Sequence, residues 1–121
     1  MSEDGGQIVD QAGNKEALQL WHKVVLENVR HNDFNLSERQ FAILLTVYIK
    51  DSQHTVKSLS EYLQITKPPV CRALDALSKH KLIERVVDKS DRRNVFIGRT
   101  DEGSEFLSKF SGNIMSVLME M

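Results

Sequence analysis

The feature that most restricts the fold of this sequence is a change of periodicity near residue 82. Up to His80, apolar residues recur every three or four positions, which is typical of amphipathic helices. After Leu82 they occur in short runs of Val, Ile and Phe, which are typical of strands. The pattern predicts a mainly α fold with a small β-hairpin (α+β), in which the hairpin directly follows a pair of helices.

Residues 55–80 are predicted to form two short helices separated by the turn Gln64–Thr66. Thr55 is suited to cap the first helix, and the second is expected to run from Thr66–Lys67 to about His80. Two prolines fall in the first turn of the second helix, where the N–H groups that they lack have no intrahelical partner. The expected core positions recur at helical spacing: Val56, Leu59 and Leu63, then Val70, Leu74 and Leu77. This pattern predicts a helix-turn-helix.

The hairpin is predicted over residues 84–98, with strands at Glu84–Asp88 and Asn94–Gly98. The loop between the strands is polar and basic, and consists of Lys89, Ser90, Asp91, Arg92 and Arg93. A hairpin with a basic tip directly after a helix-turn-helix predicts a winged helix-turn-helix.

A further helix is predicted to begin at Ser37. Ser37 and Gln40 have the spacing of a capping box, and Leu36 and Phe41 that of a hydrophobic staple. The apolar stripe expected on this helix comprises Phe41, Leu44, Leu45 and Tyr48.

The first and last helices are predicted to join two copies of the chain. Asn14 is expected to cap the first, which runs to about Asn32, and Thr100 the last. The expected dimerisation residues are Leu18, Trp21 and Val25, followed by a coiled-coil-like seam of Leu107, Phe110, Ile114, Val117 and Met121. The alternative is a seam that packs on its own domain. The predicted organisation is a flexible arm over residues 1–13 and a single domain over 14–121, with dimerisation helices at 14–35 and 101–121.

Charge is distributed unevenly along the chain, whose formal net charge is −1. Residues 54–99 hold ten Lys and Arg against five Asp and Glu, and the remainder holds six against twelve. A basic segment of this kind is expected of a domain that turns one face to phosphate groups, although many solvated surfaces are locally basic. No apolar run approaches the ~18 residues that span a bilayer. With no signal-peptide profile and a single cysteine, the cytoplasm (nucleoid) is the expected location.

The N-terminal half of the second helix of the pair is predicted to contact double-stranded DNA through Thr66, Lys67, Pro68, Pro69, Cys71 and Arg72. Arg72 is the best candidate for base readout, because a guanidinium can donate two hydrogen bonds to guanine O6 and N7. Thr66 and Lys67 lie at the positive end of the helix dipole and suit phosphates.

The residues of the hairpin tip are predicted to form a second DNA contact. Arg92 or Arg93 is expected to enter a minor groove, where narrow A·T-rich stretches concentrate negative potential. Asp91 repels phosphate, so its expected role is to hold one arginine at a fixed angle through a charge-assisted hydrogen bond.

Together these motifs resemble the MarR (multiple antibiotic resistance regulator) family, in a short variant. The resemblance covers about residues 36–107 and rests on Leu36-Ser37-x-x-Gln40, Thr55-x-x-x-Leu59-Ser60, Ile65-Thr66-Lys67-x-x-Val70-x-Arg72, Leu82-Ile83-x-Arg85, Asp91-Arg92-Arg93 and Thr100-x-x-Gly103. It implies a homodimeric regulator that binds palindromic DNA, with an Asp91–Arg93 pair and Arg93 as the minor-groove arginine. It further implies release of DNA by a small aromatic ligand or an oxidant, although no motif here marks an effector site.

The sequence departs from the family pattern at three places. Lys81 stands where a glycine is usual, so it must adopt a left-handed conformation or the helix must end differently. Arg99 stands where a leucine is usual, and the C-terminal region is short for the family.

Other functions have weaker support. Cys71 is expected to be a small helix residue rather than a redox switch, and the histidines (His22, His31, His54 and His80) are too scattered for a metal site. No phosphate-cradling glycine loop or nucleophile elbow is present, so neither an enzyme nor a cofactor is expected. The alternative function is a protein-interaction adaptor without a specific DNA site. Arg72 and the basic tip argue against it.

Overall fold

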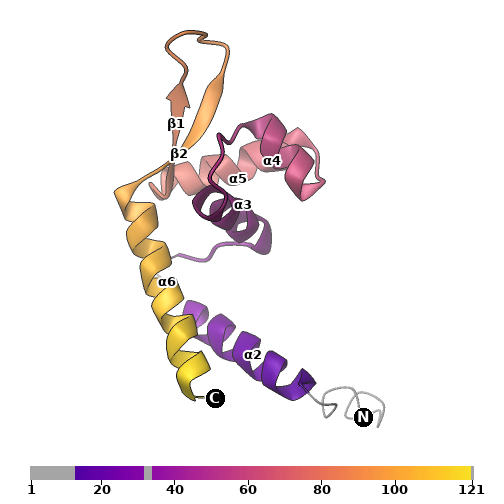
Figure 1. Cartoon of the computed structure of the whole chain (residues 1–121), viewed down its shortest axis with the longest axis vertical. Helices are drawn as coiled ribbons and strands as arrows, with labels where there is room; N and C mark the ends of the chain where they lie inside the picture. Colours follow the sequence, from indigo (N-terminus) through magenta and orange to yellow (C-terminus); the bar gives the residue numbers. More distant parts are fainter. Residues whose placement is uncertain (1–12, 32–33, 121) are drawn as a thin grey trace. The chain divides into compact units, whose positions relative to one another are not determined.

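The computed structural model describes residues 13–31 and 34–120, which form five helices and one antiparallel hairpin (Figure 1). The elements are α2 (Asn14–His31), α3 (Glu38–Ile49), α4 (Val56–Leu63), α5 (Lys67–Lys79), β1 (Ile83–Val87), β2 (Val95–Arg99) and α6 (Asp101–Glu120). The mainly α class with a small hairpin is thus confirmed. The chain divides into two compact units: the 36–107 unit, and a terminal unit made of the residues up to 35 and from 108 onward.

Local capping signals fix where the helices begin. At α3 the Gln40 amide donates to Ser37 Oγ (3.1 Å) and the Ser37 amide donates to Gln40 Oε1 (2.9 Å), so the predicted capping box is confirmed. Thr55 caps α4 in the same reciprocal way, with Ser58 as its partner. The expectation for Asn14 was wrong by one residue. Asn14 is the first residue of α2, because the Ala17 amide donates to the carbonyl of Gly13.

The core of the 36–107 unit lies between α3, α4, α5 and the root of the hairpin. Its fully buried side chains are Ile43, Leu44, Val47, Leu59, Val70, Leu74, Leu77 and Ile83. The predicted core side of α5 is confirmed, whereas Val56 and Leu63 of α4 are only half-buried. On α3 the predicted stripe was too narrow, since it lacked Ile43 and Val47. The reason is tertiary: α3 contacts α4, α5 and β2, so it buries more than one face.

The hairpin pairs β1 with β2 in the register Glu84↔Gly98 and Arg85↔Ile97. Each strand is displaced by one residue from its predicted bounds. Asp88 leaves β1 because its carboxylate accepts hydrogen bonds from Ser90 and so belongs to the tip. At the other edge of β2, the Ile97 amide donates to the carbonyl of His54 (2.8 Å), which ties the hairpin to the segment before α4.

At the end of α5, Lys81 stands at the position where a glycine was expected, and the helix still ends in a regular cap. Lys81 is left-handed, with φ of 61°, which is the first of the two predicted alternatives. The Leu82 amide donates to the carbonyl of Leu77 and the Lys81 amide to that of Ser78, the pattern of a Schellman motif. The Thr100 hydroxyl donates to the carbonyl of Lys81 (2.7 Å), so the cap of α6 also supports this corner.

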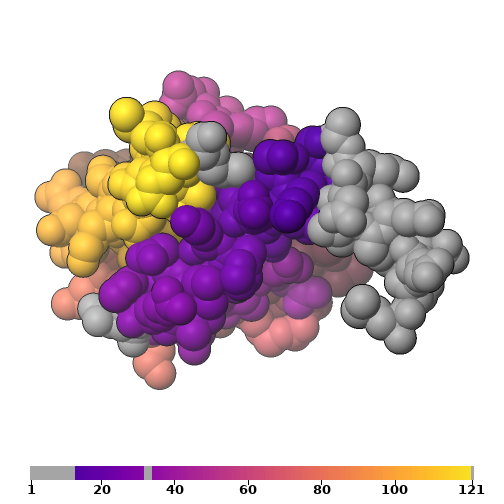
Figure 2. All heavy atoms as spheres, turned by 90° about the horizontal axis from the view of Figure 1, so that it is seen from below, coloured from indigo at the N-terminus to yellow at the C-terminus, as the bar shows by residue number. Residues whose placement is uncertain are grey.

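In the terminal unit, α2 and the last turns of α6 lie side by side (Figures 1 and 2). Lys23 pairs with Glu120 (3.3 Å), and the buried apolar residues described in this unit are Val24 and Val117. Many large apolar side chains of the unit stay exposed: Leu18, Trp21, Val25, Val29, Met115, Leu118 and Met119. Residues 1–12 of the arm predicted over 1–13, and the seam residue Met121, lie outside the described residues. None of the described helices is long and apolar enough to cross a membrane.

Candidate nucleic-acid interface

The turn between α4 and α5 sets the direction in which α5 begins. Gln64 ends α4 in the left-handed conformation with φ of 58°. The Ile65 amide donates to the carbonyl of Ser60 (3.2 Å), and the Ser60 hydroxyl donates back to the carbonyl of Ile65. The sequence places Ser60 in a motif but does not reveal this role, since the bond depends on the left-handed turn between the two residues.

The first turns of α5 present one exposed face. Val70, Leu74 and Leu77 are fully buried, which leaves Lys67, Pro68 and Arg72 exposed, with Pro69 and Cys71 half-buried. Thr66 is the extended N-cap residue and is exposed, and its hydroxyl makes no capping bond to the helix. This face offers a hydroxyl, an ammonium and a guanidinium at the positive end of the helix dipole, a combination suited to anions.

Charge on the exposed face of α5 is arranged in a specific way. Arg72 forms no ion pair within the part of the chain that the structure describes, so its guanidinium is available to an external acceptor. Asp75, three residues later, is paired with Arg85 of β1, with 2.7 Å between Arg85 Nη2 and Asp75 Oδ1. Sequence reasoning did not find this pair, because it depends on how β1 passes the helix.

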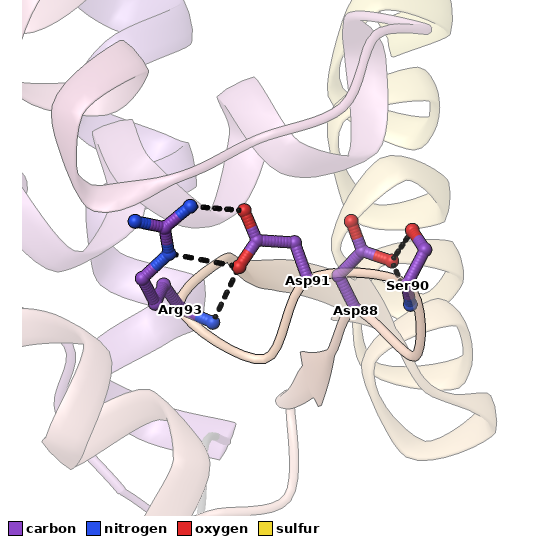
Figure 3. A network of polar contacts seen from close by, with 4 residues as sticks. All are labelled: Asp88, Ser90, Asp91 and Arg93. Atoms are coloured by element: carbon purple, nitrogen blue, oxygen red, sulfur yellow. Dashed lines mark hydrogen bonds and ion pairs between the residues drawn. The ribbon is translucent and has the colours of Figure 1, made fainter.

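The hairpin tip is held by two carboxylates (Figure 3). Arg93 donates from Nε to Asp91 Oδ1 (3.0 Å) and from Nη2 to Asp91 Oδ2 (3.1 Å), and its amide also donates to Oδ1 (3.1 Å). Asp88 Oδ1 accepts from the amide (2.9 Å) and the hydroxyl (2.7 Å) of Ser90. The side chain of Arg93 nevertheless stays 90% exposed, so the pair fixes its direction without covering it.

These bonds also set the ionisation of the tip. The Arg93 side chain lowers the pKa of Asp91, and Asp91 in turn raises the pKa of Arg93. The Ser90 hydroxyl lowers the pKa of Asp88. Both carboxylates are therefore ionised at neutral pH, as the Asp91–Arg93 pair requires. The other tip residues, Lys89 and Arg92, are exposed.

The root of the hairpin is tied to α3 by two residues whose roles were missed. Arg99 Nε donates to the carbonyl of Val47 (2.9 Å) and Nη2 approaches Asp51 Oδ1 (3.0 Å). This places a cation at the C-terminal end of α3, whose own last turn has no basic residue. Tyr48 was predicted only as a stripe residue. Its hydroxyl donates to the carbonyl of Leu82 (2.7 Å) and accepts from the Thr100 amide (2.9 Å).

The predicted DNA-contacting residues thus form two separate groups within the 36–107 unit. One group lies at the start of α5 and the other at the hairpin tip, and no hydrogen bond or ion pair described in the structure joins them. The described residues contain no group of three His, Cys, Asp or Glu that could hold a metal ion. The arrangement provides one helix face for a groove and a second, arginine-bearing projection.

Comparison with known proteins agrees with this geometry. The MarR family model matches residues 36–95. The structure of S. aureus MepR bound to ethidium bromide has a TM-score of 0.70 at 25% identity, and the match covers 86% of this chain and 73% of that one. A MepR mutant bound to an oligodeoxyribonucleotide has a TM-score of 0.68 at 26% identity, covering 87% and 72% of the two chains. Transcriptional regulator Tm0710 from Thermotoga maritima has a TM-score of 0.73 at 21% identity, covering 98% and 78%. By sequence alone, no curated protein matches the chain.

Proposed function

Because this chain carries a MarR-family domain at residues 36–95, we propose that it is a transcriptional repressor that binds a pseudo-palindromic DNA site as a homodimer. The observation that carries the proposal is an exposed, unpaired Arg72 in the second turn of α5, on the same unit as Arg93, which Asp91 aims outward. The MepR mutant bound to an oligodeoxyribonucleotide supports the choice of ligand. The protein acts in the cytoplasm on the nucleoid, needs no cofactor and has no enzymatic activity.

In this proposal α5 is the recognition helix and enters the major groove. Arg72 reads a guanine edge, while Thr66 and Lys67 bind phosphates at the start of the helix. Pro68, Pro69 and Cys71 complete the contact surface, and the prolines meet a thymine methyl group. The hairpin is the wing, and Arg93 enters the adjacent minor groove while Lys89, Ser90 and Arg92 line the tip.

The Arg93→Ala variant is expected to bind about tenfold more weakly to sites with A·T-rich flanks. On G·C-rich flanks the loss is expected to be smaller, because the wider minor groove there attracts an arginine less strongly. Titration of matched duplexes that differ only in their flanks measures both values. Equal losses on the two kinds of flank would show that Arg93 makes no minor-groove contact.

The exposed apolar side chains of the terminal unit are proposed to form the dimer interface. Leu18, Trp21 and Val25 are 50%, 57% and 38% exposed, and they share one face of α2 with Val29. On α6 the structure buries Val117 within the chain and half-buries Leu107, Phe110 and Ile114, while Met115 and Leu118 are exposed. Exposed apolar patches mark interaction sites, and we assign this one to a second copy of the chain.

Trp21→Glu is therefore expected to shift the chain from dimer to monomer at micromolar concentration. A charge at the centre of an apolar interface costs several kcal/mol, while on the isolated chain this residue is already exposed. Sedimentation velocity measures the change. Lys15→Glu, at an exposed site near the start of the same helix, serves as the control and should remain dimeric. An unchanged sedimentation coefficient for Trp21→Glu would place the interface elsewhere.

The experiment that tests the function is salt-dependent binding to the upstream DNA of the chain's own gene, with random DNA as competitor. Tight binding with a two-fold symmetric footprint and a steep loss of affinity with salt is expected. Binding no tighter than to random DNA would contradict the proposal. It would favour an architectural protein or the adaptor function.

A further inference from the structure

A carboxylate, that of Asp75, lies directly next to the proposed recognition surface on α5. The residues of α5 that remain exposed beyond its first residue recur at intervals of four, three and four, and are Pro68, Arg72, Asp75 and Lys79. This spacing places them on one face of the helix. The Asp75 side chain is therefore a neighbour of the Arg72 side chain, since residues three apart on a helix have Cβ atoms only about 5–6 Å apart. Near a phosphate backbone its negative charge opposes binding.

Arg85 from β1 is the partner of this carboxylate. Arg85 Nη2 lies 2.7 Å from Asp75 Oδ1, within the range of a strong charge-assisted hydrogen bond. The strand that carries Arg85 is itself held in place, because Arg85 lies opposite Ile97 in the ladder and Ile97 is bonded to His54. Lys79, one turn further along α5, makes no ion pair with Asp75 in the described structure. Asp75 is thus directed toward the wing strand, and Arg72 remains without an acidic partner.

We propose that Arg85 is a positioning residue for DNA recognition, which acts on the DNA-reading Arg72 by holding the Asp75 carboxylate away from it. This inference rests on the proposed function of α5. When Arg85 is removed, Asp75 loses its partner and the nearest free guanidinium on its face is that of Arg72. The ion pair that then forms between Asp75 and Arg72 withdraws Arg72 from the base edge. It also leaves the exposed face of α5 with less positive charge.

A double-mutant cycle tests this role. Arg85→Ala is expected to weaken binding to the preferred site by about tenfold and to relax discrimination at the base pair that Arg72 reads. Asp75→Asn alone should bind within about twofold of the unmodified chain, and Asp75→Asn combined with Arg85→Ala should restore both affinity and discrimination. In the Arg72→Ala background, Arg85→Ala should change discrimination no further.

Two results would overturn the proposal. If the double variant binds as weakly as Arg85→Ala, then Arg85 contacts DNA itself or acts only through the fold of the hairpin. If Arg85→Ala weakens binding equally at every base pair, its effect does not pass through Arg72. Melting temperatures of all variants identify any general loss of structure, which Asp75→Asn would not repair.

A measurement without DNA separates this proposal from the function on which it rests. The Nε–H signal of Arg72 in ¹⁵N NMR spectra should shift between Arg85→Ala and the double variant, because only the former has a carboxylate free to accept from Arg72. It should not shift between the unmodified chain and Asp75→Asn. A shift here together with no DNA site preference would refute the DNA-binding function alone, whereas an unchanged signal refutes the positioning role.

Discussion

Gly103→Ala is expected to lower the free energy of unfolding of the 36–107 unit by about 3 kcal/mol, the largest effect of any single methyl group considered for this chain. A Cβ at position 103 would lie 1.8 Å from the Tyr48 hydroxyl and 2.3 Å from the carbonyl oxygen of Leu82. Neither group can move freely, because the Tyr48 hydroxyl donates to that same carbonyl and accepts from the Thr100 amide. Either the start of α6 shifts or these bonds break.

Urea denaturation followed by circular dichroism measures the change. Gly112→Ala is the matched control, since Gly112 lies in the same helix and a Cβ there meets nothing within 4 Å. Alanine is the better helix former, so this control should be neutral or stabilise by up to about 1 kcal/mol. Adding Tyr48→Phe to Gly103→Ala should recover only part of the loss, because the contact with the Leu82 carbonyl remains. Equal stability of Gly103→Ala and Gly112→Ala would contradict the close approach seen here.

The second large effect is expected for Arg72→Ala, which should weaken binding to the preferred site by about 1–3 kcal/mol. The loss should be confined to sites with the guanine that Arg72 is proposed to contact, because a bidentate pair discriminates between bases whereas a phosphate contact does not. Competitive binding to four duplexes, each with a different base pair at that position, measures it.

Lys79→Ala provides the control for this experiment. Lys79 shares the exposed face of α5 but is the last residue of the helix, away from the N-terminal half that is proposed to reach base edges. It should weaken binding slightly and equally for all four duplexes, with a lower dependence on salt. If Arg72→Ala gives the same uniform pattern, Arg72 binds only phosphate and another residue reads the sequence.

Much of the fold could be predicted because it is encoded in short stretches of chain. The capping box of Ser37 and Gln40, the cap at Thr55 and the buried side of α5 depend on residues within one or two helical turns of each other. The Asp91–Arg93 pair is equally local, since only two positions separate its members. Such features follow from backbone geometry before any tertiary contact forms.

The features that were missed all depend on segments far apart in the sequence. Ile43 and Val47 are buried because three elements surround α3, which a single-helix pattern cannot show. Arg99 reaches the carbonyl of Val47 across 52 positions. The Asp75–Arg85 pair depends on the register of β1 beside α5. In the sequence, charged residues at such positions cannot be told apart from solvated surface residues, because tertiary packing determines which partner each one meets.

The corners that bound α5 have a consequence for how this protein can diversify. At Gln64 and at Lys81 the chain turns through a left-handed residue, and the bonds that close both corners are made largely between backbone groups. Backbone groups are the same whichever side chains the exposed positions of the helix carry. The surface that is proposed to distinguish one DNA sequence from another is therefore separate from the backbone frame that holds it. If α5 reads DNA as proposed, a copy that arises by gene duplication can exchange residues such as Arg72 for a new operator without a loss of stability.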